Sequence, residues 1–211
     1  MTTLLEIKEQ IRGFCSRYEI YLRPVVKSIL ALVTFLMIRS RLGYMTRINS
    51  MTLILVLALS CALLPVNMIV VFAAVLVLLH LYSLSLAACA VCFLVMLVMF
   101  LLYFRFLPKK AYYAVLMPLA FAFHIPYVLP VVLGLLNENP VSILSMVCGG
   151  IIYYLLAGIT ANATGIAEMT EDDSIITKFS DVLNQFVGNR EMIAMLAILV
   201  LAALVVWFLR R

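Results

Sequence analysis

The sequence predicts an all-α, polytopic helical membrane protein with about five spans, within a range of roughly four to seven. Of the 211 residues, 66% are hydrophobic and 12% are charged, whereas a soluble domain is about half apolar and about a quarter charged. Residues 51–104 contain no Asp, Glu, Lys or Arg. These residues do not alternate between apolar and polar as barrel strands do, so we expect helices, in which the backbone N–H and C=O groups form hydrogen bonds with each other.

Positive charge is concentrated near the N-terminus of a chain whose net charge is +5. Basic residues hold transmembrane helices at the cytoplasmic face and attract anionic lipid. We therefore interpret the charge as membrane anchoring and exclude a nucleic-acid partner. The residues concerned are Lys8, Arg12, Arg17, Arg23, Lys27, Arg39, Arg41 and Arg47.

Residues 1–23 are predicted to form an amphipathic helix. It could lie in the membrane interface or pack on a partner, and the interface is favoured because the membrane is already present. The first ten residues mix acids and bases, unlike the basic run and apolar core of a cleavable signal, so we expect this segment to be retained. Its apolar side chains recur at spacings of three and four residues, namely Leu4, Ile7, Ile11, Phe14, Tyr18 and Leu22.

Residues 24–50 are predicted to form a short, partly inserted helix and a basic loop. Pro24 suits the first turn of a helix, where a missing N–H costs nothing. The apolar run Val25–Ile38 would reach only about 21 Å, less than the roughly 30 Å of the hydrocarbon core. Because Lys27 and Arg39 place positive charge at both ends of the run, we expect it to stay within one leaflet.

Residues 51–159 are predicted to form the membrane core, and its first block is 51–106. That block contains two apolar runs separated by a break at Pro65, which removes a helix hydrogen bond. The runs are either two tightly turned short helices or one broken helix that crosses once. The apolar runs are Met51–Leu64, Met68–Tyr82 and, after a second break at Ser83 and Ser85, Leu86–Phe106.

Loop charge favours the single broken crossing. Basic loops are expected to share the cytoplasmic side, so an even number of crossings should separate the basic residues on either side of block 51–106. One crossing by Met51–Tyr82 and a return by Leu86–Phe104 meets that condition. We therefore expect a protein of the plasma membrane with its basic loops in the cytoplasm. Those loops carry Arg39, Arg41, Arg47, Arg105, Lys109 and Lys110.

The second block, 111–159, resembles the first in plan. The run Ala111–Leu136 is interrupted by Pro118, Pro126 and Pro130, and Val141–Ile159 is an uninterrupted span. Placing Pro65 over Pro126 aligns a broken-helix element and a full span in each block. This indicates a degenerate internal repeat of 51–106 and 111–159, an organisation found in transporters. The alternative is that any two hydrophobic segments align this well.

Two further segments complete the predicted organisation. Residues 160–190 form a polar linker that contains a second amphipathic, interfacial helix ending at Gly188 and Asn189. Residues 191–211 form a C-terminal transmembrane helix with Trp207 and two arginines as anchors. The linker also carries an acidic cluster that we interpret as a solvated linker or a surface for docking a partner, because it lacks the ligand pattern of a calcium loop. The cluster is Glu168, Glu171, Asp172 and Asp173.

His80, His124 and Asn67 are the candidates for a substrate or proton pathway. His80 and His124 are the only histidines, and each lies near a break in an apolar segment. An ionisable group inside a membrane is a functional candidate by default. The alternative is that each histidine lies near the interface or bonds a carbonyl of a broken helix, while Asn67 bonds its local backbone.

The sequence contains no pattern that predicts an enzyme, a cofactor or a metal site. There is no Gly-rich phosphate loop, nucleophile elbow or HExxH motif, and the predicted spans contain no Asp or Glu. The five cysteines predict no disulfide framework, and the Cys89 and Cys92 pair is better explained by close helix packing.

Two functions remain open. The first is a non-enzymatic membrane subunit of a larger transport, export or envelope assembly, with protein partners or a second copy of the chain bound beside the lipid bilayer. The second is a stand-alone transporter or channel for a small, neutral solute. The lack of a midplane carboxylate or cation weighs against coupled transport.

Overall fold

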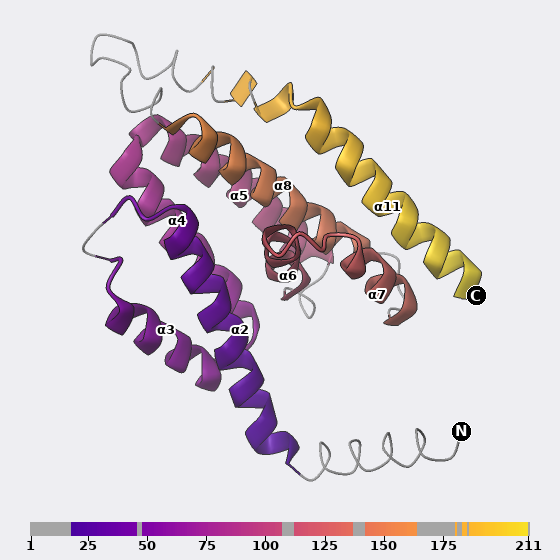
Figure 1. The fold of residues 1–211 in the computed structure, drawn as a ribbon, viewed down its shortest axis with the longest axis horizontal. Helices are drawn as coiled ribbons and strands as arrows, with labels where there is room; N and C mark the ends of the chain where they lie inside the picture. The colour runs from indigo at the N-terminus through magenta and orange to yellow at the C-terminus, as the bar shows by residue number, and fades with distance from the viewer. Residues whose placement is uncertain are drawn as a thin grey trace.

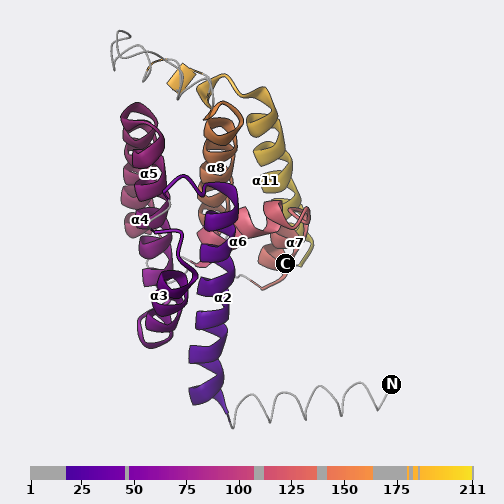
Figure 2. The same ribbon diagram turned by 60° about the vertical axis from the view of Figure 1, so that its left-hand side comes forward.

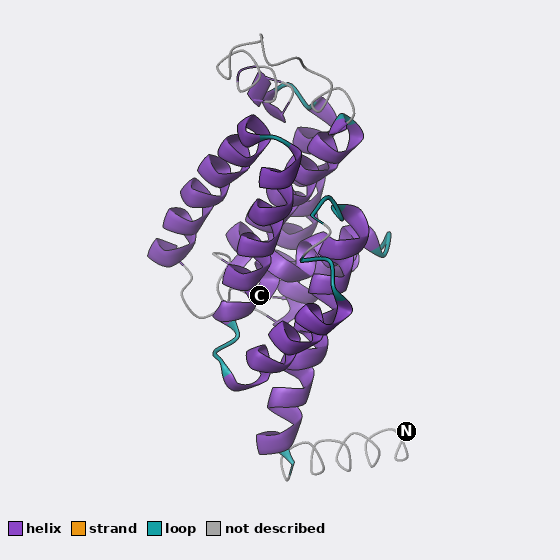
Figure 3. Cartoon of the chain, turned by 90° about the vertical axis from the view of Figure 1, so that its left-hand side faces the viewer, coloured by secondary structure: helices purple, strands orange, loops and turns teal. Residues whose placement is uncertain are grey.

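The computed structural model describes residues 18–45, 48–106, 112–136, 142–163, 180, 183–184 and 186–210. Its elements in these ranges are α-helices, without a strand (Figures 1 and 3). This agrees with the predicted all-α class. The helices are α2 (Glu19–Arg41), α3 (Met51–Leu63), α4 (Asn67–Leu84), α5 (Leu86–Phe106), α6 (Tyr112–Ala122), α7 (Val128–Leu136), α8 (Ser142–Ala161) and α11 (Arg190–Arg210).

Four of the described helices are long and apolar enough to cross a membrane. They are the 22-residue Ile20–Arg41, the 18-residue Asn67–Leu84, the 19-residue Ile143–Ala161 and the 21-residue Arg190–Arg210. At about 1.5 Å per residue these lengths correspond to roughly 27–33 Å, close to the thickness of a hydrocarbon core. The chain therefore has the helices of a membrane protein.

Helix α2 is longer than predicted. It begins at Glu19 and continues through Pro24 to Arg41, over 23 residues, so the predicted start at Pro24 and end at Ile38 were wrong. Pro24 lies early in the helix, where its missing N–H removes only the bond to the Ile20 carbonyl, and the helix continues across it. At about 34 Å, α2 is long enough to cross, which removes the length argument for partial insertion.

Helix α3 runs antiparallel to α2. The Arg39 guanidinium Nη1 lies 3.2 Å from the Met51 sulfur at the start of α3. At the other end, the Lys27 Nζ donates a hydrogen bond of 3.3 Å to the Leu64 carbonyl oxygen. The end of α3 therefore lies beside Lys27, about two helical turns from the start of α2.

Helix α4 then brings the chain back to the loop that follows α2. The Met45 N–H donates to His80 Nδ1 at 3.3 Å, and the Ser83 hydroxyl donates to the Tyr44 carbonyl at 3.3 Å. Helices α3 and α4 thus form a hairpin, and the predicted single broken crossing was wrong. The chain reverses because Leu64 takes an extended conformation and Pro65 cannot donate to the preceding turn.

One buried cluster defines an end of the bundle. It contains Leu42 directly after α2, Leu81 near the end of α4, Ala88 near the start of α5 and Ile159 near the end of α8. Helices α2, α4 and α8 therefore finish at this end and α5 starts there (Figures 1 and 2). We call it the Arg41 end, and we call the opposite end, where α5 finishes, the Phe106 end.

This arrangement contradicts the predicted shared side for the basic residues around block 51–106. The α3–α4 hairpin returns to the end that it left, so α5 is a single, odd crossing. Arg41 and Arg105 consequently belong to helix ends on opposite sides of the bundle. Charge counting failed here because the sequence does not show whether a chain broken at Pro65 continues or reverses.

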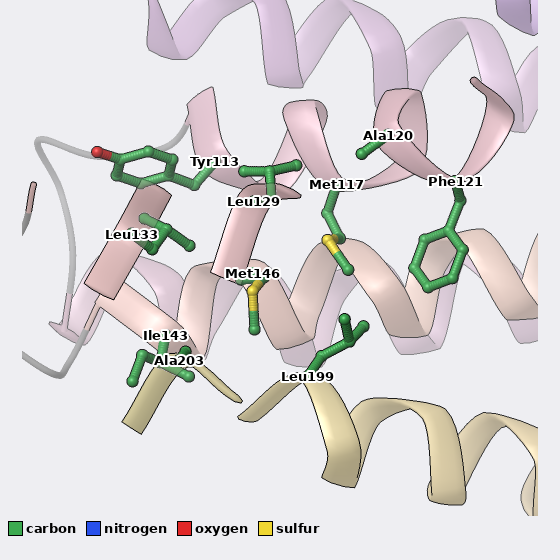
Figure 4. Close-up of a cluster of buried hydrophobic side chains, with 10 residues drawn as sticks. All are labelled: Tyr113, Met117, Ala120, Phe121, Leu129, Leu133, Ile143, Met146, Leu199 and Ala203. Atoms are coloured by element: carbon green, nitrogen blue, oxygen red, sulfur yellow. The ribbon is translucent and has the colours of Figure 1, made fainter. Parts of the chain in front are cut away.

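A second broken pair, α6–α7, leaves and returns at the Phe106 end, because it lies between the end of α5 and the start of α8. Pro126 lies in the predicted break, whereas Pro118 and Pro130 lie within helices. Helices α6, α7, α8 and α11 share one buried cluster, which Figure 4 shows. It consists of Tyr113, Met117, Ala120, Phe121, Leu129, Leu133, Ile143, Met146, Leu199 and Ala203.

Glycines let these helices approach closely. A Cβ on Gly149 of α8 would lie 2.5 Å from the Ala114 carbonyl oxygen and 2.8 Å from the Met117 Cβ of α6. A Cβ on Gly134 of α7 would lie 2.7 Å from the Val206 Cβ of α11. Small residues at crossings are a general means of packing membrane helices, and here they fix how α6 and α7 lie against their neighbours.

The second predicted amphipathic helix falls mostly outside the described residues, as do residues 1–17 of the first. Its described residues Leu183 and Phe186 are helical and pack against the cluster at the Arg41 end. The helix ends where predicted, since the Gly188 N–H bonds the Asn184 carbonyl at 2.8 Å. Asn189 then caps α11, because its Oδ1 accepts from the Met192 N–H at 3.1 Å.

Candidate binding cavity

Five helices, α2, α4, α5, α6 and α8, surround a cavity of about 490 Å³. This volume falls within the range of roughly 300–1,000 Å³ that is usual for small-molecule sites. Three of its walls, α2, α4 and α8, are helices long and apolar enough to cross a membrane. Most of its lining is apolar, for example Met37, Val71, Met99, Pro118 and Ile152.

Short side chains on three of the walls leave the space open. Ala74 of α4, Ala114 of α6 and Ala157 of α8 all line the cavity. The α6 wall is held in place by the close crossing at Gly149, whose Cα faces the backbone of Ala114. The cavity therefore depends on a helix crossing that tolerates no side chain.

The hydroxyl groups of two lining threonines already donate within their own helices. Thr34 Oγ1 donates to the Leu30 carbonyl at 2.7 Å, and Thr160 Oγ1 donates to the Ala157 carbonyl at 3.0 Å. Bonds of this kind satisfy a hydroxyl that would otherwise be costly in an apolar environment. They leave the cavity with few donors for a polar solute.

An aromatic cluster closes the side of the cavity next to α6 and α8. Tyr153 lines the cavity, and its ring stacks on Phe121 with centroids 4.6 Å apart and an interplanar angle of 9°. Tyr154 meets Phe121 edge to face, at 5.4 Å and 75°. Aromatic pairs in these geometries add to the stability given by burial, so this wall is a rigid one.

Arg41 is the charged residue of the described lining. It is the last residue of α2 and is exposed. Within the ranges that the structure describes, its guanidinium forms no hydrogen bond or ion pair. Within the described lining, the cavity thus has mostly apolar walls and one cation, at its Arg41 end.

The predicted pathway residues do not come together at this cavity. Asn67 lines it as the first residue of α4, but neither histidine is among the lining residues. His80 is buried, 2% exposed, and its Nδ1 accepts from Met45. An accepting Nδ1 carries no proton, so this contact fits a neutral imidazole that fixes the loop after α2.

His124 lies in the turn between α6 and α7 and is exposed. Its φ of 59° places it in the left-handed region. The Ile125 N–H bonds the Ala120 carbonyl at 2.9 Å and the His124 N–H bonds the Phe121 carbonyl at 3.1 Å. These two bonds are those of a Schellman motif, which ends α6 with His124 at the position that glycine usually occupies.

The predicted docking cluster of Glu168, Glu171, Asp172 and Asp173 lies outside the described residues.

Two other titratable groups, Tyr44 and Cys89, do not line the cavity. Tyr44 lies in the loop after α2, outside the helices, and burial raises the pKa of its phenol. Cys89 donates weakly to the Leu78 carbonyl at 3.5 Å, so it packs α5 onto α4. Within the described ranges, no group of three His, Cys, Asp or Glu side chains is arranged to hold a metal.

Apart from Asn67, sequence reasoning missed the residues that form the cavity. Arg41 was interpreted as a topological anchor, and Ala74, Ala114 and Ala157 carry no distinctive motif. A partial signal was present in Gly149 and Gly150, because neighbouring small residues on an apolar helix predict a close crossing. That signal does not identify the partner helix.

Comparisons of the chain with family models, with curated proteins and with solved structures found no match. The assignment of function therefore rests on the cavity and on the arrangement of the helices around it.

Proposed function

We propose that the chain is a non-enzymatic integral membrane protein that binds a small, largely apolar molecule in its five-helix cavity and supports the passage of that molecule through the membrane. The observation that carries this proposal is the 490 Å³ cavity between candidate membrane spans. Away from Arg41 its walls are apolar and its threonine hydroxyls are satisfied within their helices, so burying a charged or strongly polar group among these walls would not be compensated.

The arrangement of the two broken pairs supports a transport role. The α3–α4 hairpin starts and ends at the Arg41 end and is followed by α5, whereas α6–α7 starts and ends at the Phe106 end and is followed by α8. The same order of elements thus occurs twice with opposite direction. We propose that blocks 51–106 and 111–159 are an inverted repeat, the plan on which many transporters are built around a central site.

We further propose that the protein lies in the plasma membrane and that its Phe106 end faces the cytoplasm. Helix α2 starts at this end with Arg23, α11 finishes there at Arg210, and the sequence joining α5 to α6 adds Lys109 and Lys110. An excess of Lys and Arg marks the cytoplasmic side. The Arg41 end carries Arg39 and Arg41 on α2, but the sequence between α8 and α11 contains four acidic residues, Glu168, Glu171, Asp172 and Asp173.

Photo-crosslinking in lipid nanodiscs tests the cavity as a binding site. The probe is a fatty alcohol with a diazirine in its alkyl chain, and the labelled peptides are identified by mass spectrometry. We expect α2 and α8 peptides that line the cavity to be labelled and unlabelled decanol to compete. Ala157→Phe should fill the cavity and remove most of this labelling, by roughly tenfold if about 1.4 kcal/mol of binding is lost.

Ala90→Phe is the matched control, because Ala90 lies on α5 and is exposed to the surroundings of the bundle. It should leave the labelling of the cavity unchanged. Equal labelling of the chain and its Ala157→Phe variant would contradict the proposal. Recovery of a stoichiometric protein partner from native membranes would instead support the predicted role as a subunit of a larger assembly.

A further inference from the structure

We propose that the ligand of the cavity is an amphiphile with an acidic head group, whose alkyl chain lies among the apolar walls and whose head binds the guanidinium of Arg41. This inference deepens the proposed function and rests on it. It assigns a chemical class to a cavity whose walls alone would accept any apolar molecule of suitable size.

The position of Arg41 carries the first step. Arg41 is the last residue of the candidate span Ile20–Arg41, so it lies where a membrane helix meets the polar interface. It also lines the cavity, whose other walls reach down α2 to Thr34. A molecule that places its chain beside Thr34 and its head beside Arg41 would have each part in a medium of matching polarity.

The charge balance carries the second step. No Asp or Glu is among the described residues that line the cavity, and no described residue pairs with Arg41. The hydroxyl of Thr160, at the same end, is already used by the Ala157 carbonyl. Recognition of a head group at this end therefore falls to the guanidinium, whose planar fork suits a carboxylate or phosphate in two-point contact.

A structural role for Arg41 makes a different prediction. Arg39 and Arg41 both lie in the last turn of α2, where cations interact favourably with the helix dipole. If that were the whole role of Arg41, its removal would lower the stability of α2 and would not change which ligand the cavity prefers. Arg39 does not line the cavity, so it provides a matched comparison.

The test compares two diazirine probes of equal chain length, a fatty acid and a fatty alcohol, on the full chain in nanodiscs of neutral phosphatidylcholine. A hydrogen bond to a charged group contributes about 1.5–3 kcal/mol, so the acid should label the cavity roughly tenfold or more in excess of the alcohol. Arg41→Gln should remove this preference while labelling by the alcohol persists. Arg39→Gln should keep the preference.

Arg41→Lys guards against a folding defect, because it retains the charge and should keep part of the preference for the acid. If only free fatty acid competes with the labelling, the ligand has a single alkyl chain. If phosphatidylglycerol competes as well, the site also accepts membrane lipid. Both results support an acidic head group. Equal labelling by acid and alcohol, with Ala157→Phe still blocking both, would overturn this inference and leave the proposed function standing. Labelling unaffected by Ala157→Phe would overturn the proposed function.

Discussion

The two broken pairs, α3–α4 and α6–α7, reverse the chain by different means. At the tip of α3–α4, the carbonyl of Leu64 is left without a helical partner and accepts a hydrogen bond from Lys27, 37 residues away. At the tip of α6–α7, the backbone satisfies itself through the Schellman bonds around His124. The first turn depends on a distant side chain, and the second depends on a local backbone conformation.

Packing differs between the pairs in the same way. The α3–α4 hairpin packs on α2 through interdigitating side chains, among them Phe35, Ile54 and Ile69. The α6–α7 pair also packs through buried side chains, but it adds two close glycine crossings, Gly149 against the backbone of Ala114 and Gly134 against Val206 of α11. Side chains can adjust to a changed neighbour, whereas a backbone contact cannot. The second pair should therefore be the more sensitive to small additions of volume.

The sharpest test of this difference is Gly149→Ala. The new Cβ would lie 2.5 Å from the Ala114 carbonyl oxygen, so α6 and α8 would have to separate. Overpacking of this kind costs about 1–3 kcal/mol, and we expect the upper part of that range because the contact is with backbone. Unfolding in mixed micelles with increasing dodecyl sulfate, followed by circular dichroism, would measure the loss.

Two other glycines on α8, Gly150 and Gly158, provide the controls. The one close contact of a Cβ on Gly150 would be with the Cδ2 methyl of Leu196, which can rotate away, so Gly150→Ala should cost less than Gly149→Ala. A Cβ on Gly158 meets nothing within 4 Å, so Gly158→Ala should stabilise the helix by about 0.5–1 kcal/mol through propensity alone. An equal effect at all three positions would contradict the proposed backbone crossing.

Lys27→Met tests the first pair. Methionine keeps the apolar length of the side chain but leaves the Leu64 carbonyl without its donor, so we expect a loss of about 1 kcal/mol. Lys27→Arg retains a donor and should recover most of the stability in the same unfolding measurement. No loss in Lys27→Met would mean that water or lipid satisfies the carbonyl as well as Lys27 does.

The helices were largely predictable from the sequence, because their signals are local. The breaks at Pro65 and Ser85 lie within a residue or two of the observed helix ends, and the end of the segment before α11 at Gly188 was placed correctly. The length of α2 was not predictable, since a proline near the start of a helix is compatible both with a new helix and with one that continues.

The cavity and the direction of the chain after each break were not predictable, because they depend on contacts between distant residues. The reversal after Leu64 is stabilised by Lys27 from another helix. Ala74, Ala114 and Ala157 form a common space only because the backbone at Gly149 sets the crossing of α6 and α8. The place of Arg41 in the cavity lining depends on the same packing, and the sequence shows this residue only as a basic residue after an apolar run.

The last expected effect concerns His124, and like that of Gly158→Ala it is a small stabilisation. A non-glycine residue in the left-handed region costs roughly 1–2 kcal/mol, whereas glycine there has no such strain but gains freedom in the unfolded chain. His124→Gly should therefore stabilise the α6–α7 turn by about 0.5–1 kcal/mol in the unfolding measurement.

Because His124 does not line the cavity, photo-labelling by the fatty-alcohol probe should be unchanged in His124→Gly. The same variant thus separates two interpretations of this histidine. A stabilised protein with normal labelling would assign His124 to the backbone turn. Lost labelling in a stabilised protein would return His124 to the predicted substrate pathway and would mean that the turn between α6 and α7 moves against the cavity when a ligand enters.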